Sequence, residues 1–126
     1  MVNTRARGFT LIELLVVLAI VATLLMLAVP RYFQAIDSSK EAVLIENLRT
    51  TRDAIDKFWA DNGRYPDSLD ELVAKRYLRS VPVDPVNESA ALWNIVPPPS
   101  DAKGKVYDLK SSATGQTRGG RPLGDL

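Results

Sequence analysis

One acidic residue, Glu13, stands inside the most apolar stretch of the chain. The 21 residues from Phe9 to Val29 carry no other charged side chain, and their only other polar residues are Thr10 and Thr23. An acid near the centre of a membrane-spanning helix costs about 2.5–3.5 kcal/mol on insertion scales, so it is rarely found there without a partner. The chemistry that Glu13 offers is therefore charge pairing with a cation.

A cut between Gly8 and Phe9 would create such a cation. Cleavage there removes residues 1–8 and leaves the α-amine of Phe9 four residues before Glu13. Positions i and i+4 lie on one face of a helix, so the amine can meet Glu13 of its own chain or that of a neighbouring copy. Pairing between chains also sets the axial register of one subunit on the next.

The apolar stretch is long enough to cross a bilayer core of about 30 Å as a helix. Arg5 and Arg7 precede it, and the positive-inside rule then places the N-terminus in the cytoplasm and the rest of the chain outside. A secretory signal peptide has a shorter apolar core, and a helix buried in a soluble protein has an apolar stripe rather than an apolar circumference. A plain signal anchor would account for the length but not for Glu13.

A resemblance to type IV pilins and type II secretion pseudopilins is carried by residues 7–17, which read Arg-Gly-Phe-Thr-Leu-Ile-Glu-Leu-Leu-Val-Val. This segment is similar to the class III leader and helix start of that family. The resemblance implies cleavage between Gly8 and Phe9 by a prepilin peptidase, followed by N-methylation of Phe9. It also implies that Glu13 is the assembly glutamate and that Pro30 kinks the helix.

After Pro30 the sequence predicts an amphipathic continuation of the same helix as far as Asp61. Asn62 and Gly63 then end it, since both tolerate the left-handed cap conformation. The expected packing residues recur at three- and four-residue steps and are Phe33, Ile36, Lys40 (through its aliphatic stem), Val43, Ile45, Leu48, Ile55, Phe58 and Trp59.

Ser68 followed by Glu71 is typical of the start of a short second helix. Residues 93–96 and 105–109 alternate with period two, which predicts an antiparallel hairpin that must pack on the long helix because two strands alone are marginal in water. We expect the tail, residues 110–126, to be either disordered or an extended cover on the sheet edge.

The expected fold class is therefore α+β and type IV pilin-like. A long N-terminal helix, half transmembrane and half amphipathic, packs against a short helix and a small antiparallel sheet. We divide the chain into a leader (1–8), a transmembrane and filament-core helix (9–29), its amphipathic continuation (30–61) and a small periplasmic α/β part with a polar tail (62–126).

Composition disfavours several function classes. The chain has 16 basic and 15 acidic residues, and removal of residues 1–8 leaves 14 and 15, so there is no electrostatic case for nucleic acid. It has no Cys and no His, which disfavours zinc, iron and copper sites as well as thiol and Ser-His-Asp catalysis. We expect no enzymatic activity. The lack of a disulfide is also more typical of pseudopilins than of pilins.

Calcium is the one cofactor that the resemblance suggests. Residues 82–85, Pro-Val-Asp-Pro, are similar to a segment of major (G-type) pseudopilins, which carry a calcium site in their C-terminal loops. Calcium needs six to eight oxygen ligands, and this chain offers no Asp-rich loop. We expect no cofactor, and the weak calcium candidates are the scattered residues Asp84, Asp101, Asp108 and Asp125.

The sequence thus predicts a pseudopilin, a structural filament subunit that polymerises through its N-terminal helix in a type II secretion-type machine and drives protein export. Expected partners are copies of itself, other pilins and pseudopilins, prepilin peptidase, an inner-membrane assembly platform and membrane lipid. The expected location is the bacterial inner membrane, crossed once, and then a periplasmic or surface filament. Alternatives are a major or minor type IV pilin in adhesion, motility or DNA uptake, or a tip module that binds a ligand or DNA through Arg118 and Arg121.

Overall fold

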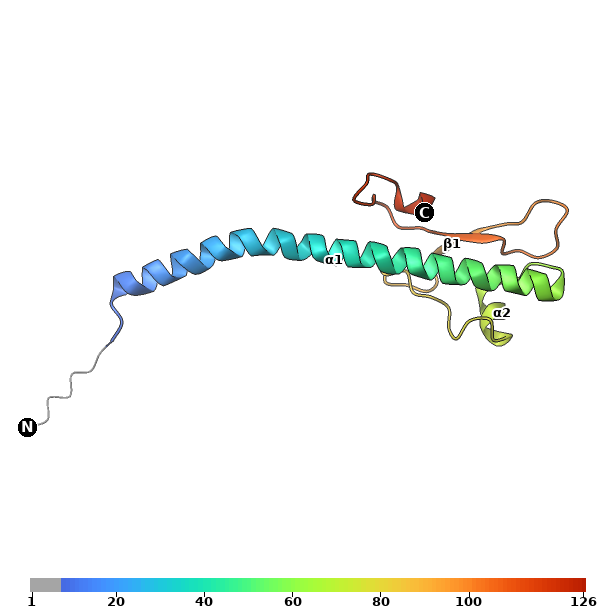
Figure 1. Ribbon diagram of the computed structural model, residues 1–126, viewed down its shortest axis with the longest axis horizontal. Coiled ribbons are helices and arrows are strands. Elements are labelled where there is room, and N and C mark those ends of the chain that lie inside the picture. Colours follow the sequence, from blue (N-terminus) through green and yellow to red (C-terminus); the bar gives the residue numbers. More distant parts are fainter. Residues whose placement is uncertain (1–7) are drawn as a thin grey trace, which may run out of the picture. The chain divides into compact units, whose positions relative to one another are not determined.

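The computed structural model describes residues 8–126. The chain divides into two compact units, Met1–Asp37 and Ser38–Leu126. In chain order the elements are α1 (Leu11–Asn62), α2 (Leu69–Ala74), β1 (Trp93–Val96), β2 (Asp108–Ser111) and a 3-10 turn, η1 (Leu123–Asp125) (Figure 1). This confirms the α+β class: one long helix, one short helix and a two-stranded antiparallel sheet.

Helix α1 has 52 residues, and local signals mark both of its ends. The Thr10 hydroxyl accepts a hydrogen bond from the backbone N–H of Glu13 at 3.2 Å, which satisfies one of the free donors of the first turn. At the other end Gly63 has φ +69°, and its N–H donates to the carbonyl of Trp59 at 2.9 Å. The predicted helix, Phe9 to Asp61, is confirmed to within two residues at each end.

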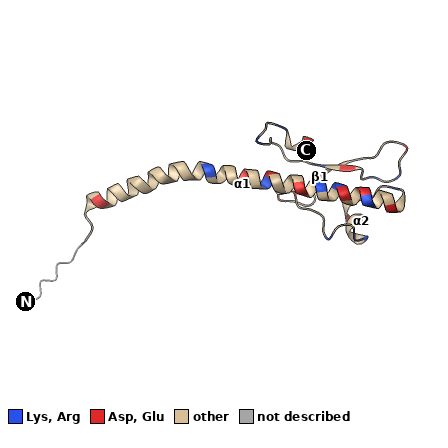
Figure 2. Ribbon diagram, viewed as in Figure 1, with Lys and Arg blue, Asp and Glu red and all other residues tan. Residues whose placement is uncertain are grey.

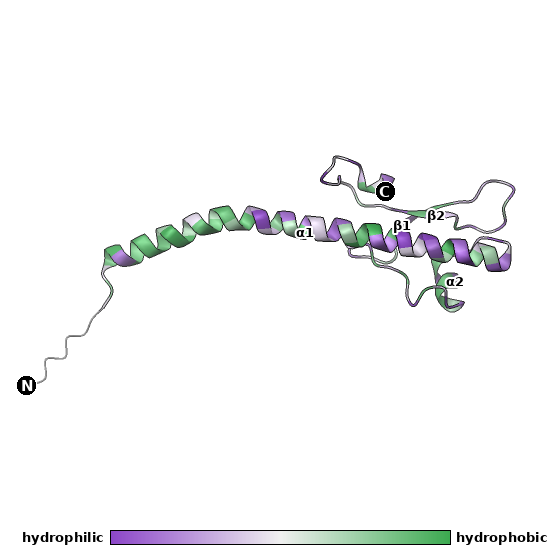
Figure 3. Ribbon diagram, viewed as in Figure 1, coloured by the Kyte–Doolittle hydropathy of each residue, from purple (hydrophilic) through white to green (hydrophobic). Residues whose placement is uncertain are grey.

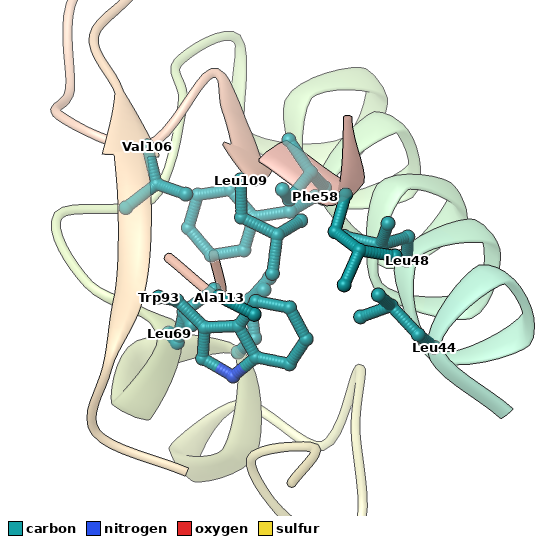
Figure 4. Close-up of a cluster of buried hydrophobic side chains, with 11 residues drawn as sticks. Leu44, Leu48, Phe58, Leu69, Trp93, Val106, Leu109 and Ala113 are labelled. Atoms are coloured by element: carbon teal, nitrogen blue, oxygen red, sulfur yellow. The ribbon is translucent and has the colours of Figure 1, made fainter. Parts of the chain in front are cut away.

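One face of the second half of α1 forms the core of the second unit. The buried residues Leu44, Leu48, Thr51, Ile55 and Phe58 follow each other at steps of three and four, as one face of a helix requires. Figure 4 shows the hydrophobic cluster that Leu44, Leu48, Ile55 and Phe58 join, to which the rest of the unit contributes Leu69, Leu72, Trp93, Val106, Leu109, Ala113 and Leu123.

The predicted packing stripe was correct for Leu48, Ile55 and Phe58 and wrong for four other residues. Phe33 is 59% exposed, and Val43, Ile45 and Trp59 are each about half exposed, while Leu44, which the prediction omitted, is fully buried. The reason is geometric. Leu44 and Leu48 are four residues apart and share a face, whereas Val43 and Ile45 each point about 100° away from Leu44.

Helix α2 begins where the capping signal predicted it. The Ser68 hydroxyl accepts a hydrogen bond from the backbone N–H of Glu71 at 3.2 Å. The carboxylate of Glu71 forms an ion pair with Arg64 at 2.8 Å. Just after α2, the Tyr77 hydroxyl donates to Asp61 Oδ2 at 2.7 Å, and this hydrogen bond raises the pKa of Tyr77 because its ionisation would bring two negative charges together.

The sheet pairs Trp93 with Ser111 and Val96 with Asp108, in antiparallel register. The predicted first strand is confirmed, but the predicted second strand, 105–109, begins too early. The backbone N–H groups of Lys105 and Val106 donate to the carbonyl of Pro66 at 3.1 and 2.9 Å, so this segment pairs with the chain before α2. The β2 strand therefore begins only at Asp108.

The C-terminal tail is an extended cover rather than a disordered segment. Its residues Ala113 and Leu123 are buried, and Gln116 pairs with Pro122 in an isolated antiparallel bridge. Near that bridge Arg118 reaches α1, where its guanidinium donates to the Ser38 hydroxyl at 2.7 Å and its backbone N–H donates to Glu41 Oε2 at 3.2 Å.

Arg52 joins α1 to both the sheet and the tail. Its Nε donates to Asp108 Oδ1 at 2.7 Å, and its Nη2 donates to the carbonyls of Leu109 at 3.1 Å and Leu126 at 2.7 Å. One guanidinium thus holds α1 to β2 and to the end of the tail, whose contact residues lie 56 and 74 residues after Arg52 in sequence.

Leu44 and Val43 are adjacent in sequence but lie on different faces of α1, so their substitutions should have different effects on stability. Leu44→Ala should lower the free energy of unfolding of the second unit by about 2–5 kcal/mol, because it leaves a cavity in a fully packed face. Val43→Ala should change it by less than about 0.5 kcal/mol, because that side chain is half exposed. Urea unfolding of the detergent-solubilised protein, followed by tryptophan fluorescence, measures both. Equal losses for the two variants would contradict the assigned face.

Candidate assembly and processing site

The predicted cleavage site lies in the non-helical residues just before α1. Phe9 is 91% exposed, and a side chain added at Gly8 would meet nothing within 4 Å in the described part of the chain. Residues 1–7 of the predicted leader lie outside the described residues. No packing around Gly8 in the described part of the chain requires a glycine, and cleavage after it stays a prediction.

Glu13 lies in the first turn of α1, and its side chain is exposed. Figure 2 shows it as the only charged residue of the helix before Arg31. The free N–H groups of a helix start favour a negative charge by about 0.3–1 kcal/mol, which is less than the cost of placing that charge in lipid. Within residues 8–126, none of the ion pairs involves Glu13. Pairing of this carboxylate with a cation of its own mature N-terminus or of another copy stays a prediction.

The apolar residues around Glu13 have no cover in the first unit. Every large apolar side chain from Leu11 to Val29 is at least 43% exposed, and the apolar character extends around the helix (Figure 3). By length and composition α1 can cross a membrane, and none of its most apolar 18-residue window is buried.

Pro30 lies within α1, one residue before Arg31. Its ring nitrogen carries no hydrogen, so the carbonyl of Met26 lacks the donor that a helix normally supplies four residues later. The helix continues through Pro30 as far as Asn62. A kink at Pro30 stays a prediction.

The four calcium candidates have different surroundings. Asp84 is fully buried, and its carboxylate accepts hydrogen bonds from the backbone N–H groups of Val86 at 2.9 Å and Asn87 at 3.3 Å and from the Ser111 hydroxyl at 2.5 Å. These contacts bind the loop after Pro82 to β2. Asp84 therefore has a structural role that the sequence analysis did not predict, although an Asp directly before a proline is a common turn signal.

The other three calcium candidates do not lie with Asp84 in one site. Asp108 is paired with Arg52, and Asp101 and Asp125 are exposed. Across residues 8–126, no three acidic side chains come together in a way that could hold a metal ion. The expectation of no cofactor stays a prediction, and the side chains named as weak calcium candidates are dispersed or already hydrogen bonded.

The two arginines offered for a phosphate or DNA contact are also engaged within the chain. Arg118 donates to Ser38, and Arg121 Nη2 donates to the carbonyl of Asp125 at 2.7 Å. Both guanidiniums help to hold the tail in place.

Comparison with known proteins supports the N-terminal assignment. Residues 3–29 match the family described as the prokaryotic N-terminal methylation motif. A type IV major pilin of Neisseria gonorrhoeae is 32% identical over 111 residues, which are 86% of this chain and 49% of that pilin. A type IV major pilin of Myxococcus xanthus is 37% identical over 70 residues, 56% of this chain and 32% of that protein.

The type II secretion system core protein G of Pectobacterium carotovorum is 30% identical over 106 residues, which cover 71% of this chain and 68% of that protein. No solved structure matches the chain. This chain belongs to the type IV pilin-like family, which comprises pilins and pseudopilins. The relatives are structural subunits and not enzymes, as the sequence predicted. The chain spans half or less of the length of the two pilins.

The role of Asp84 can be tested by removing its acceptor oxygens. Asp84→Ala leaves three donors without a partner and should lower the free energy of unfolding by about 2–4 kcal/mol, while Asp84→Asn keeps one acceptor and should cost less. Asp101→Ala is the control, since that side chain is exposed. Thermal unfolding with and without Ca²⁺ is the measurement, and the parent protein should unfold at the same temperature in both. A Ca²⁺-induced increase that Asp84→Ala abolishes would instead make Asp84 a calcium ligand.

Proposed function

We propose that this chain is a pseudopilin, a filament subunit of a type II secretion-type machine that polymerises through residues 9–29. The observation that carries the proposal is the exposed, apolar circumference of α1 from Leu11 to Val29. Fourteen large apolar side chains are exposed there, and removing apolar surface from water is favourable by about 25 cal/mol per Å². This surface therefore needs a cover from outside the chain.

Two covers fit this surface in succession. A lipid bilayer suits the monomer, because the apolar length matches the hydrocarbon core. The same helices of other copies suit the filament, because helices of this kind pack closely at interaxial distances of about 8–10 Å. The subunit passes from the first cover to the second during assembly.

Glu13 selects the correct register when a subunit moves from the bilayer into the filament. Prepilin peptidase cuts between Gly8 and Phe9, and the new α-amine of Phe9, once methylated, remains a cation. Pairing of that amine with Glu13 of a neighbouring copy neutralises both charges in an apolar environment, where an unpaired charge is costly. Assembly on an inner-membrane platform is therefore favoured only when two copies meet in the correct register.

The proposed location follows from the same elements. The monomer crosses the bacterial inner membrane once, with its N-terminus in the cytoplasm and the second unit in the periplasm, and then enters a periplasmic filament. Export would be driven when the growing filament pushes folded cargo outward.

We favour a secretion machine because of the share of each relative's length that this chain matches. The match to the Pectobacterium core protein G spans about two thirds of both chains, whereas the gonococcal pilin extends to twice the matched length. A type IV pilus subunit is the second candidate, favoured by the 86% of this chain that aligns with that pilin. A tip module that binds DNA has less support, because Arg118 and Arg121 already make contacts within the chain.

The role of Glu13 gives a specific prediction. Glu13→Gln should leave the protein cleaved and inserted in the membrane but should reduce assembled filaments to the background level, because the neighbour's amine then loses its counter-charge. Glu13→Asp keeps the charge on a shorter side chain and should retain part of the assembly. Intact mass reports cleavage, membrane flotation reports insertion, and the sheared fraction reports filaments. A normal filament yield from Glu13→Gln would overturn the proposed role.

The two candidate machines are separated by deletion of the gene in its host. We expect the deletion strain to lose exported proteins from its medium while its sheared surface fibres remain. Complementation with the parent gene should restore export, and complementation with the Glu13→Gln variant should not. Loss of fibres with normal export would instead make the chain a type IV pilus subunit.

A further inference from the structure

Two aromatic side chains follow immediately after the apolar half of α1. Tyr32 is 65% exposed and Phe33 is 59% exposed, and their rings meet edge to face with centroids 6.0 Å apart. Arg31, directly before them, is the first charged residue after Glu13. The core of the second unit uses none of these three side chains.

The helical positions of these residues give this turn two different sides. Tyr32 and Phe33 lie three and four residues after Val29, so both rings share a side with the last residue of the apolar stretch. Arg31 and Gln34 are three residues apart and lie together on the opposite side, and both are exposed. The apolar surface of the span thus continues past Pro30 on one side only.

The distance along the helix places the rings at the edge of a bilayer. The middle of the stretch from Phe9 to Val29 is Ala19, and Tyr32 and Phe33 lie about 20 Å beyond it at 1.5 Å per residue. Half of the hydrocarbon core is about 15 Å, and the polar headgroup layer extends to about 20–22 Å from the centre. The rings therefore fall within the headgroup layer when the span is centred.

We propose that Arg31, Tyr32 and Phe33 form an interfacial anchor that fixes the depth of the unassembled subunit in the lipid bilayer. Both rings lie at the level of the lipid headgroups, where the polar edge of Tyr32 is favoured, while the Phe33 ring extends the apolar side toward the acyl chains and the Arg31 guanidinium reaches toward lipid phosphate. The lipid surface is the occupant that continuity favours, because Val29 and Phe33 belong to one uninterrupted apolar side. This inference rests on the membrane-anchoring part of the proposed function.

The depth of the anchor is measurable because the chain has no cysteine. Single spin labels are attached to Leu18→Cys, Gln34→Cys and Asp56→Cys in the full chain, reconstituted in vesicles of phosphatidylethanolamine and phosphatidylglycerol. Accessibility to oxygen and to a water-soluble nickel chelate then gives the depth of each label. Tyr32 and Phe33 remain intact in all three variants.

We expect the label at position 18 to be deep in lipid, the label at 56 to be in water and the label at 34 to lie between them at headgroup level. Tyr32→Ser with Phe33→Ser should raise the nickel accessibility at position 34 toward that at 56. The matched control is Val43→Ser with Ile45→Ser, which removes two half-exposed apolar side chains from the same helix and should change nothing at position 34.

Two results would overturn the anchor and leave the membrane span in place. One is a label at 34 as accessible to nickel as the label at 56 in the parent sequence. The other is no change at 34 in the double serine variant while position 18 stays in lipid. A water-accessible label at position 18 would overturn both the anchor and the proposed membrane insertion.

Discussion

The apolar first half of α1 has no covering surface in its own unit, and the behaviour of the subunit depends on this fact. A helix that is apolar on all sides is stable only where it is surrounded, by lipid or by other helices. Residues 3–29, which include most of this surface, match the prokaryotic N-terminal methylation motif. The same exposed surface would thus serve first as a membrane anchor and then as the packing surface of a filament.

The second half of α1 is apolar on one face only. That face is covered by a six-residue helix, a two-stranded sheet and an extended tail. Such elements are marginal alone, so a few polar contacts fix their places. Arg52 binds the sheet and the tail to the helix, and the buried Asp84 binds the preceding loop to β2. A unit with no disulfide is thereby held closed by hydrogen bonds around a compact core.

The sequence predicted those helix ends that are set by residues within the same turn. The C-terminal end of α1 follows from Asn62 and Gly63, and the start of α2 follows from Ser68, because each of these residues acts on its own turn. The β2 strand was misplaced because Lys105 and Val106 bond to Pro66, about forty residues earlier, and no periodicity reports such a contact. The order of the tail depends on Arg52 and Ser38, which lie 74 and 80 residues before their tail partners. Glu13 stands out by its type and position alone, because it is a charge in an apolar run, and its role in assembly stays a prediction.

The central claim is that the apolar halves of α1 from different copies cover one another in the assembled state. Disulfide cross-linking of sheared filaments tests it most directly, with two single-cysteine variants co-expressed in each strain. The proposed pairing of Phe9 with a neighbour's Glu13 offsets adjacent copies by about four residues, so the pairs are Leu14→Cys with Leu18→Cys, Leu15→Cys with Ala19→Cys, Val16→Cys with Ile20→Cys and Val17→Cys with Val21→Cys. We predict covalent dimers in the filament fraction from the pairs that face one another, and none from the same pairs dispersed in membranes. Filaments that form normally and give no cross-link from any of the four pairs would contradict the claim.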